Sequence, residues 1–256
     1  MRRHLPAAVV LLVIVTVVLG FGYPYLVTGL SDALFRNQAD GSPVYRGGKL
    51  IGSSLLGQEF ANAKGSPLPR YFQPRPSQAG TGYDGSDSAA SNLGPSNPLL
   101  VGFVPGVNTV GLNGKTSRTN PFATPADPAC VPVDPSGMPV TSPVPGQRYA
   151  RNADGSYVCD PGTIPERALA YRKFNGLPAG SSVPIDAVTA SGSGLDPDIS
   201  VANALDQAPR VARARHIAVS TVVALVHRHT QGSQWGFLGE PTVNVLGLNL
   251  ALDRLR

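Results

Sequence analysis

Residues 5–31 read LPAAVVLLVIVTVVLGFGYPYLVTGLS and contain no charged side chain. A membrane-spanning helix needs about 20 mostly apolar residues to cross roughly 30 Å of hydrocarbon, so this run is long enough to span a bilayer. A cleaved signal peptide has a shorter apolar region, about 7–15 residues, followed by small residues at the cleavage point. Ser31, Asp32 and Ala33 match that cleavage pattern poorly. The run therefore predicts an uncleaved transmembrane helix over residues 5–31.

The charges that flank this run predict its orientation. Arg2 and Arg3 precede it and Asp32 follows it. Because Lys and Arg near a span favour the cytoplasmic side, residues 1–4 are expected in the cytoplasm and residues 32–256 outside it. The sequence therefore predicts a single-pass protein of the plasma membrane with an extracytoplasmic domain.

Composition indicates how much of that domain is loop. The chain has 29 Gly, 25 Pro and only 14% charged residues, which is typical of a domain rich in irregular structure. Its net charge is +5, but the basic residues are scattered and form no stripe interleaved with aromatic residues. A nucleic-acid partner is therefore not expected.

Residues 101–162 are predicted to be a long irregular insertion, because Pro and Gly recur every few positions and no periodicity persists. The insertion contains the chain's two cysteines, Cys130 and Cys159. Outside the cytoplasm such a pair is expected to form a disulfide, which would stabilise the fold by about 2–4 kcal/mol. No histidine lies between them, so a metal site is not predicted.

The rest of the domain is predicted to mix strands and helices. A hairpin is expected over residues 44–51 around Gly47-Gly48, and a short strand over residues 70–72. Ser200 and Ser220 are expected to cap helices, and Pro209 to interrupt the first of these. Apolar periodicity and end signals predict helices over residues 165–174, 201–207, 221–230 and 244–255. The fold class predicted is α+β: one transmembrane helix, then a mixed domain with a long insertion.

The stretch TASGSGLDPDIS, residues 189–200, is the strongest candidate for a functional loop. It matches neither G-x-S-x-G, the pattern around a hydrolase nucleophile, nor the glycine patterns that bind phosphate. We therefore interpret Ser191, Gly192, Ser193, Gly194 and Asp196 as a structural loop before a helix. The alternative is a membrane-anchored envelope serine hydrolase that uses Ser193 with His216, His227 or His229. His227 and His229 are two residues apart, a spacing that does not bring helical side chains together on a metal, so a metal site is not predicted. Because the loop also lacks the nucleophile pattern, no catalytic residues are predicted.

Seven blocks, in this order, resemble the KdpC family, the C subunit of the Kdp potassium-transporting P-type ATPase. They are YPYLVTGL (23–30), GSSLLGQEF (52–60), RYFQPRPS (70–77), SNLGPSNP (91–98), VTASGSGLDPDIS (188–200), QAPRVARAR (207–215) and GEPTVNVLGLNLALD (239–253). The resemblance implies an accessory subunit that assembles with a channel-like subunit and an ATP-hydrolysing subunit. The insertion over residues 101–162 departs from the compact pattern of the family.

The resemblance also implies a role as a catalytic chaperone that promotes ATP binding and potassium import. Gln207, in the block that resembles the family's Gln-x-Pro-Arg-Val-Ala, is the one residue it nominates for nucleotide contact; the alternative for Gln207 is a surface or capping glutamine. The predicted topology disfavours direct contact, because ATP lies inside the cell and the domain outside. No tightly bound cofactor is expected, and potassium is implied as the ion that the complex transports.

Overall fold

The computed structural model describes residues 4–94 and 162–255, residues 97 and 100, and short pieces between 132 and 158. Cys130, Cys159 and most of the predicted insertion lie outside the described residues. The chain divides into two compact units, Met1–Leu56 and Gly57–Arg256.

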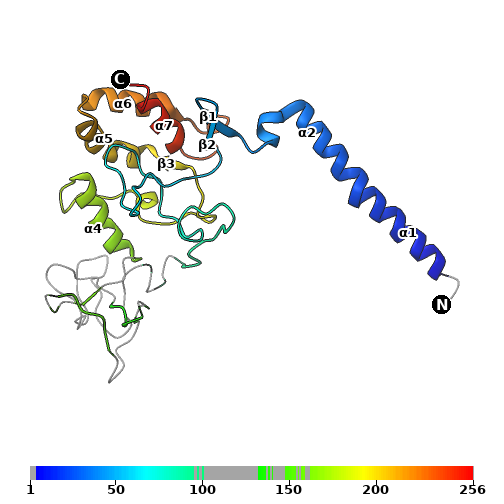
Figure 1. Cartoon of the computed structure of the whole chain (residues 1–256), viewed down its shortest axis with the longest axis horizontal. Coiled ribbons are helices and arrows are strands. Elements are labelled where there is room, and N and C mark those ends of the chain that lie inside the picture. Colours follow the sequence, from blue (N-terminus) through cyan, green and yellow to red (C-terminus); the bar gives the residue numbers. More distant parts are fainter. Residues whose placement is uncertain are drawn as a thin grey trace. The chain divides into compact units, whose positions relative to one another are not determined.

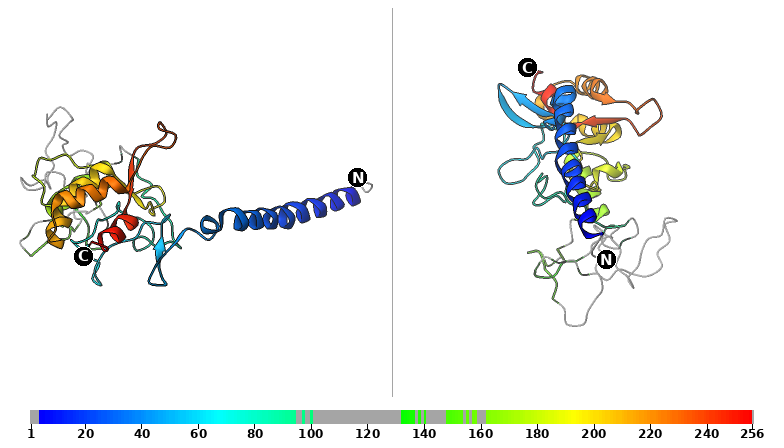
Figure 2. Two further views of the ribbon diagram at one scale, coloured as in Figure 1. Left: turned by 90° about the horizontal axis from the view of Figure 1, so that it is seen from above. Right: turned by 90° about the vertical axis from the view of Figure 1, so that its right-hand side faces the viewer.

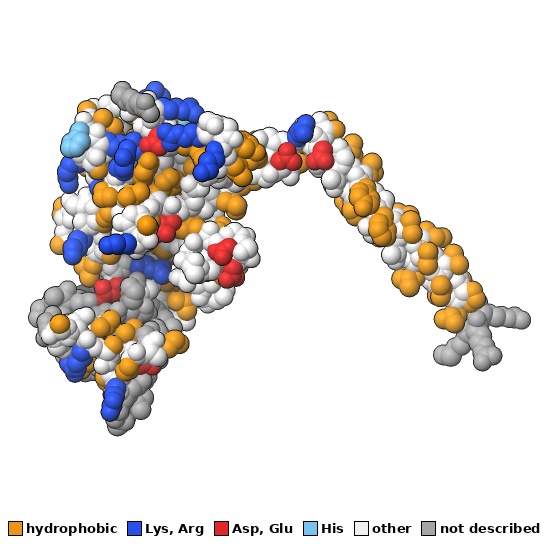
Figure 3. Space-filling model, viewed as in Figure 1, with side chains coloured by type: hydrophobic (Ala, Val, Ile, Leu, Met, Phe, Trp, Pro, Cys, Tyr) orange, Lys and Arg blue, Asp and Glu red, His pale blue; other side chains and the backbone are white. Residues whose placement is uncertain are grey.

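The first unit begins with a long helix that is apolar along most of its length (Figures 1 and 3). It consists of α1 (Leu5–Val17), a π-helical turn (Val18–Gly22) and α2 (Tyr23–Ala39). Together they form a helix of 35 residues, long and apolar enough to cross a membrane. The helix continues eight residues beyond the predicted span of 5–31. We attribute the π-helical turn to Pro24, which has no N–H for the preceding turn, a loss that membrane helices accommodate by local π geometry.

A hairpin follows the helix, as predicted around Gly47-Gly48. Strand β1 (Pro43–Arg46) pairs antiparallel with β2 (Lys49–Ser53). Both turn glycines have positive φ, +57° and +77°, the backbone that a two-residue hairpin turn requires and that glycine adopts without strain.

The second unit combines helices with a small antiparallel sheet, which confirms the predicted α+β class (Figure 1). The strand order is β3 (Asp198–Ser200), β5 (Thr242–Asn244), β4 (Thr230–Gln231). The helices are α4 (Ile164–Asn175), a 3₁₀ turn (Ile185–Ala187), α5 (Val201–Arg215), α6 (Val219–His229) and α7 (Val245–Leu252). The apolar sides of α5, α6 and α7 form one core with Phe72 and the sheet residues Ile199 and Val243.

Helix ends follow the sequence signals in most places. Thr163 caps α4 by accepting from the Glu166 N–H, and Gly176 ends it in the left-handed conformation at φ 69°. Ser200 caps α5, as predicted. The predicted Ser220 cap is wrong: α6 begins at Val219, and Ala218 at its cap position makes no side-chain bond. The left-handed His216 turns the chain so tightly that the next helix starts within three residues.

Two further predictions fail because long-range contacts override local signals. Residues 70–72 form no strand; the amide side chain of Asn249 instead bonds both backbone groups of Phe72, as a strand neighbour would. Helix α5 runs through Pro209 without interruption. A proline inside a helix costs about 3 kcal/mol, and here the buried residues on both sides of it, including Ala204, Ala208 and Val211, hold the two halves in line.

Candidate functional site

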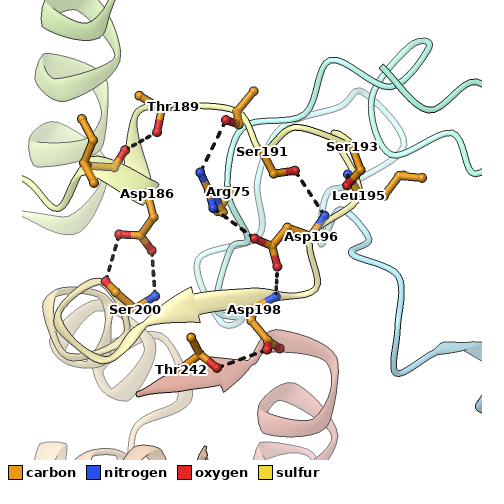
Figure 4. Close-up of polar contacts among 12 residues, drawn as sticks. Arg75, Asp186, Thr189, Ser191, Ser193, Leu195, Asp196, Asp198, Ser200 and Thr242 are labelled. Atoms are coloured by element: carbon orange, nitrogen blue, oxygen red, sulfur yellow. Dashed lines mark hydrogen bonds and ion pairs between the residues drawn. The ribbon is translucent and has the colours of Figure 1, made fainter. Parts of the chain in front are cut away.

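The glycine-rich loop over residues 189–200 combines hydrogen bonds within the loop with bonds to other segments of the fold (Figure 4). The Ser193 hydroxyl accepts from the Leu195 N–H at 3.1 Å, and the Ser191 hydroxyl accepts from the Asp196 N–H at 3.4 Å. The Asp196 carboxylate accepts from the Asp198 N–H at 3.0 Å. Such local bonds are what Ser and Asp side chains make in turns, and they fix the path of the chain into β3.

Gly194 is the residue that fixes how this loop packs. Its φ is +71°, and an added Cβ would lie 2.5 Å from the Ala89 carbonyl oxygen and 2.8 Å from the Ala79 nitrogen. The Ser77 hydroxyl donates to the Gly194 carbonyl at 2.6 Å. Gly192, by contrast, is exposed and has nothing within 4 Å of such a Cβ. Only one of the two glycines is therefore required by close approach.

Arg75 joins the loop to the segment before it (Figure 4). Its guanidinium pairs with the Asp196 carboxylate at 3.0 Å, with side-chain exposures of 24% and 33%, and donates to the Ala190 carbonyl at 3.4 Å. The Tyr83 hydroxyl donates to the Arg75 carbonyl. Burial, and secondarily Glu59, raises the pKa of Tyr83, so this hydroxyl stays protonated and keeps donating.

The Asp186 carboxylate accepts hydrogen bonds from the N-terminal end of α5. It accepts from the Ser200 N–H at 2.8 Å, the Ser200 hydroxyl at 2.9 Å and the Asn203 side-chain amide at 3.0 Å. The Ser200 hydroxyl also accepts from the Asn203 N–H at 3.1 Å. A carboxylate at a helix N-terminus is favoured by the unpaired N–H groups there. The loop therefore leads directly into a doubly capped helix.

Gln207 lies at the centre of a buried amide network. Its side-chain nitrogen donates to the Gln73 carbonyl at 3.0 Å and to Asn203 Oδ1 at 2.8 Å. Its oxygen accepts from the Gln73 N–H at 2.7 Å and from Arg210 at 2.8 Å. Gln207 is only 2% exposed, so the expectation of a surface or capping glutamine is wrong. Both of its N–H groups and its oxygen are bonded within the fold.

Arg210, one turn further along α5, is a buried cation that donates to neutral acceptors. Its guanidinium donates to Asn175 Oδ1, to Gln207 Oε1 and to the carbonyls of Pro69 and Tyr71, and it lies 4.3 Å from the centre of the Phe174 ring. Burial lowers the pKa of Arg210 to about 10, so the group is still charged at neutral pH. The network binds α5 to α4 and to the segment over residues 69–75.

A pocket of about 460 Å³ opens beside this network. Its walls are mostly apolar and aromatic, with Tyr83, Tyr171 and Phe174 among them, and Gln207 lies in the lining. The Tyr171 hydroxyl donates to Asn203 Oδ1 at 2.9 Å, and burial together with Asp206 raises the pKa of Tyr171. The charged residues in the lining are Glu59, Arg75 and Arg167.

Comparison with known proteins identifies the family. A model of the family described as "KdpC: K+-transporting ATPase, c chain" matches residues 5–130 and 161–254. The chain belongs to the KdpC family. Three relatives carry the name potassium-transporting ATPase KdpC subunit: one from Mycobacterium tuberculosis (strain H37Rv), 41% identical over 255 residues, one from Methylococcus capsulatus, 40% over 257, and one from Acidobacterium capsulatum, 36% over 253. The alignments cover 99–100% of each chain.

Within this KdpC-family fold, the residues of the hydrolase alternative lie on different elements. Ser193 is exposed on the loop before β3. His216 ends α5, roughly 24 Å along that helix from Ser200 at 1.5 Å per residue, while His227 and His229 lie in the last turn of α6. Among the described residues, no hydrogen bond joins Ser193 to a histidine, and no group of three His, Cys, Asp or Glu is placed to hold a metal. The geometry gives the hydrolase alternative no support.

Sequence reasoning missed the buried polar residues Asn203, Arg210 and Asn249, which join segments of this KdpC-family domain. Asn203, Gln207 and Arg210 recur at positions i, i+4 and i+7 of α5, which places them along one side of the helix. This spacing predicts a polar stripe on the helix, but it does not identify the residues that the stripe bonds to.

The sequence analysis also did not predict an exposed aromatic tip, residues 232–239, which connects β4 to β5. Trp235 is 84% exposed, Phe237 74% and Leu238 44%. The Gln234 N–H donates to the Leu238 carbonyl at 2.8 Å, which closes the tip. Figure 2 shows the connection projecting from the rest of the unit. Exposed aromatic residues of this kind are enriched among the anchors of protein interfaces.

Proposed function

We propose that the chain is an accessory subunit of a high-affinity, ATP-driven potassium uptake complex. In this proposal it assembles with a channel-like subunit that passes potassium and with a P-type subunit that hydrolyses ATP. The observation that carries the proposal is the family match, which extends from the apolar helix to residue 254.

We further propose that the helix anchors the subunit in the plasma membrane. Residues 1–4 would lie in the cytoplasm, the segment over residues 5–31 in the bilayer, and residues 32–256 outside. Arg2 and Arg3 support this orientation, because both precede the span. The helix supports the anchoring itself: none of its described residues is buried, so its apolar surface is available to lipid.

The proposed effect on ATP binding follows from the same arrangement. A catalytic chaperone outside the membrane would act by binding one conformation of the pump more tightly than another, which shifts the population without touching ATP. Direct contact of Gln207 with nucleotide stays a prediction. It would require breaking bonds that this amide now makes with Gln73, Asn203 or Arg210. The geometry therefore supports a positioning role for Gln207.

The exposed tip supports the assembly role. It is built like an interface anchor, with two aromatic side chains largely free of packing. We assign it to a partner subunit of the complex. The disulfide between Cys130 and Cys159 remains a prediction, to be checked by the mass of the peptide pair before and after reduction.

The test is co-purification. The chain is expressed with the channel-like and P-type subunits of the proposed complex, extracted in mild detergent and isolated by a tag on the P-type subunit. We expect this chain in the complex, and loss of potassium-stimulated ATP hydrolysis when it is omitted. Its absence from the purified complex, or full ATPase activity without it, would contradict the proposal.

A further inference from the structure

The apolar helix of the first unit contains a proline near the middle of the predicted span. Pro24 follows the π-helical turn Val18–Gly22, inside a helix that runs from Leu5 to Ala39. Proline has no N–H, so a carbonyl of the preceding turn loses its donor. In hydrocarbon such a loss is costly, because no water is there to bond the carbonyl. The position of that carbonyl therefore indicates where the span needs a donor from outside.

The hydrogen bonds of the π-helical turn place this loss at Leu19. In an α-helix the Leu19 carbonyl would accept from the N–H of Tyr23, four residues later. Here the Tyr23 N–H donates to the Val18 carbonyl instead. A π-type bond, from the residue five positions later, is not possible either, because that residue is Pro24. The Leu19 carbonyl therefore loses both of the backbone donors that these two helix types would give it.

The neighbouring residues of the helix supply no replacement. The π geometry directs the Gly22 N–H to the Val17 carbonyl, five positions earlier. Ser and Thr hydroxyls bond carbonyls three or four residues before them, but those positions after Leu19 are Gly22 and Tyr23, and a tyrosine hydroxyl lies at the far end of its ring. A Cβ at Gly22 would lie 3.7 Å from the Val17 carbonyl oxygen, so glycine here leaves the carbonyls of this turn accessible. The donor has to come from outside this helix.

In the proposed anchoring, Leu19 lies near the middle of the bilayer. It is about 18 Å before Ser31, the end of the predicted span, at 1.5 Å per residue. The hydrocarbon core is roughly 30 Å thick, so lipid headgroups do not reach the middle of the span. The unit over residues 57–256 would lie outside the bilayer and would not reach it either. A neighbouring helix is the remaining source that supplies such donors in membranes.

We propose that a transmembrane helix of a partner subunit donates a hydrogen bond from a polar side chain to the Leu19 carbonyl. The family is described as the c chain of a K+-transporting ATPase, which implies other subunits as partners. Hydroxyl and amide side chains are the groups that bond between helices in membranes, and small residues such as Gly20 and Gly22 let another helix approach closely. The inference rests on the proposed assembly and anchoring, and it adds the point of contact and its chemistry.

Pro24→Ala tests the proposal by returning the missing N–H to the helix. The carbonyls of the preceding turn are then bonded within the helix, so the donor of the partner gains less by binding there. A hydrogen bond between membrane helices changes association by about three- to ten-fold. We expect the Pro24→Ala chain to bind the other subunits more weakly by that factor in quantitative co-purification. Pro6→Ala is the matched control: Pro6 lies in the first turn of the same helix, where no carbonyl loses a donor, so association should not change.

A spectroscopic signature separates this bond from a change in helix shape. Carbon-13 in leucine carbonyls and nitrogen-15 in glycine mark the Leu19–Gly20 peptide group of the full chain, and the NMR signal is assigned by its loss in Leu19→Val. A carbonyl carbon resonates further downfield when its oxygen accepts a hydrogen bond. We expect the Leu19 signal to move downfield from the chain alone in lipid to the complex. In Gly22→Val, whose side chain covers this turn, that movement should disappear.

The outcomes separate this inference from the proposed function. A chain that does not co-purify with the other subunits contradicts the proposed function. A complex that forms while the Leu19 signal stays unchanged overturns the hydrogen bond alone. A signal that is already downfield in the chain without its partners overturns it too, because water or a second copy of the chain then supplies the donor. Equal association of the Pro24→Ala and Pro6→Ala chains would also contradict it.

Discussion

At the scale of single residues, Gly194 provides the sharpest test of the glycine-rich loop. Gly194→Val combines a β-branched residue at φ +71° with contact distances below 3 Å to the Ala79 and Ala89 backbone. We expect the free energy of unfolding to fall by roughly 2–4 kcal/mol. Urea unfolding of the detergent-solubilised chain measures it. The matched control Gly192→Val, in open space, should change it by less than about 0.5 kcal/mol. Equal effects of the two changes would show that the loop does not depend on close packing at residue 194.

Gln207 distinguishes a positioning residue from a nucleotide contact. Gln207→Leu keeps the volume but removes the partner of both Gln73 backbone groups and one of the hydrogen bonds that Arg210 donates. Each unsatisfied buried group costs about 1–3 kcal/mol, so we expect a loss of stability of roughly 2–5 kcal/mol. The exposed Gln231→Leu is the control and should be near neutral. A Gln207→Leu chain that unfolds normally but lowers the ATP affinity of the assembled pump would instead favour nucleotide contact.

The sequence could indicate the polar network only in part, and the reason is physical. Asn203, Gln207 and Arg210 repeat at helical spacing, so a polar stripe on α5 was readable. Its partners were not, because Gln207 bonds Gln73 across 134 positions and Asn249 bonds Phe72 across 177. An amide that completes the hydrogen bonding of a distant backbone has no local signature. The strand predicted over residues 70–72 failed for this same reason.

At the scale of elements, local signals worked where the partners are also local. Thr163, Gly176, Ser200 and the Gly47-Gly48 turn all act within a few residues of their own positions. Pro209 is the opposite case. Its local cost was read correctly, but the burial of α5 on both sides of it outweighs that cost. Helix boundaries that a short connection determines were also predicted wrongly, such as the start of α6 after His216.

The connection between β4 and β5 is the element we expect to hold a partner subunit. Trp235→Ala removes a side chain that is 84% exposed, so the stability of the isolated chain should not change. Loss of an interface anchor costs about 2 kcal/mol or more, which predicts at least about a ten-fold weaker association. Quantitative co-purification with the other subunits measures it. Ile185→Ala, at 65% exposure on the 3₁₀ turn, is the control. Unchanged association of the Trp235 variant would remove the tip from the interface.

At the scale of the whole molecule, the two units differ in what stabilises them. The second unit has a core of buried aliphatic residues joined by buried amides. The helix of the first unit has no buried residue, although its composition is strongly apolar. Exposing that surface to water would cost roughly 25 cal/mol for each Å², which favours the proposed placement of α1 and α2 in lipid. In the proposed anchoring, lipid would supply this environment, and the flanking charge would set the orientation.

Protease accessibility tests that orientation directly. In right-side-out vesicles, added protease should digest the unit over residues 57–256 and leave an N-terminal epitope tag intact. In inverted vesicles the tag should be lost and the folded unit protected. Because Arg2 and Arg3 precede the span, Arg2→Gln with Arg3→Gln should increase the fraction of chains in the opposite orientation, while Lys64→Gln should not. Protection of the folded unit in right-side-out vesicles would place that unit in the cytoplasm, where ATP lies. The subunit could then contact ATP directly, and the proposal that it acts only through the pump's conformation would be wrong.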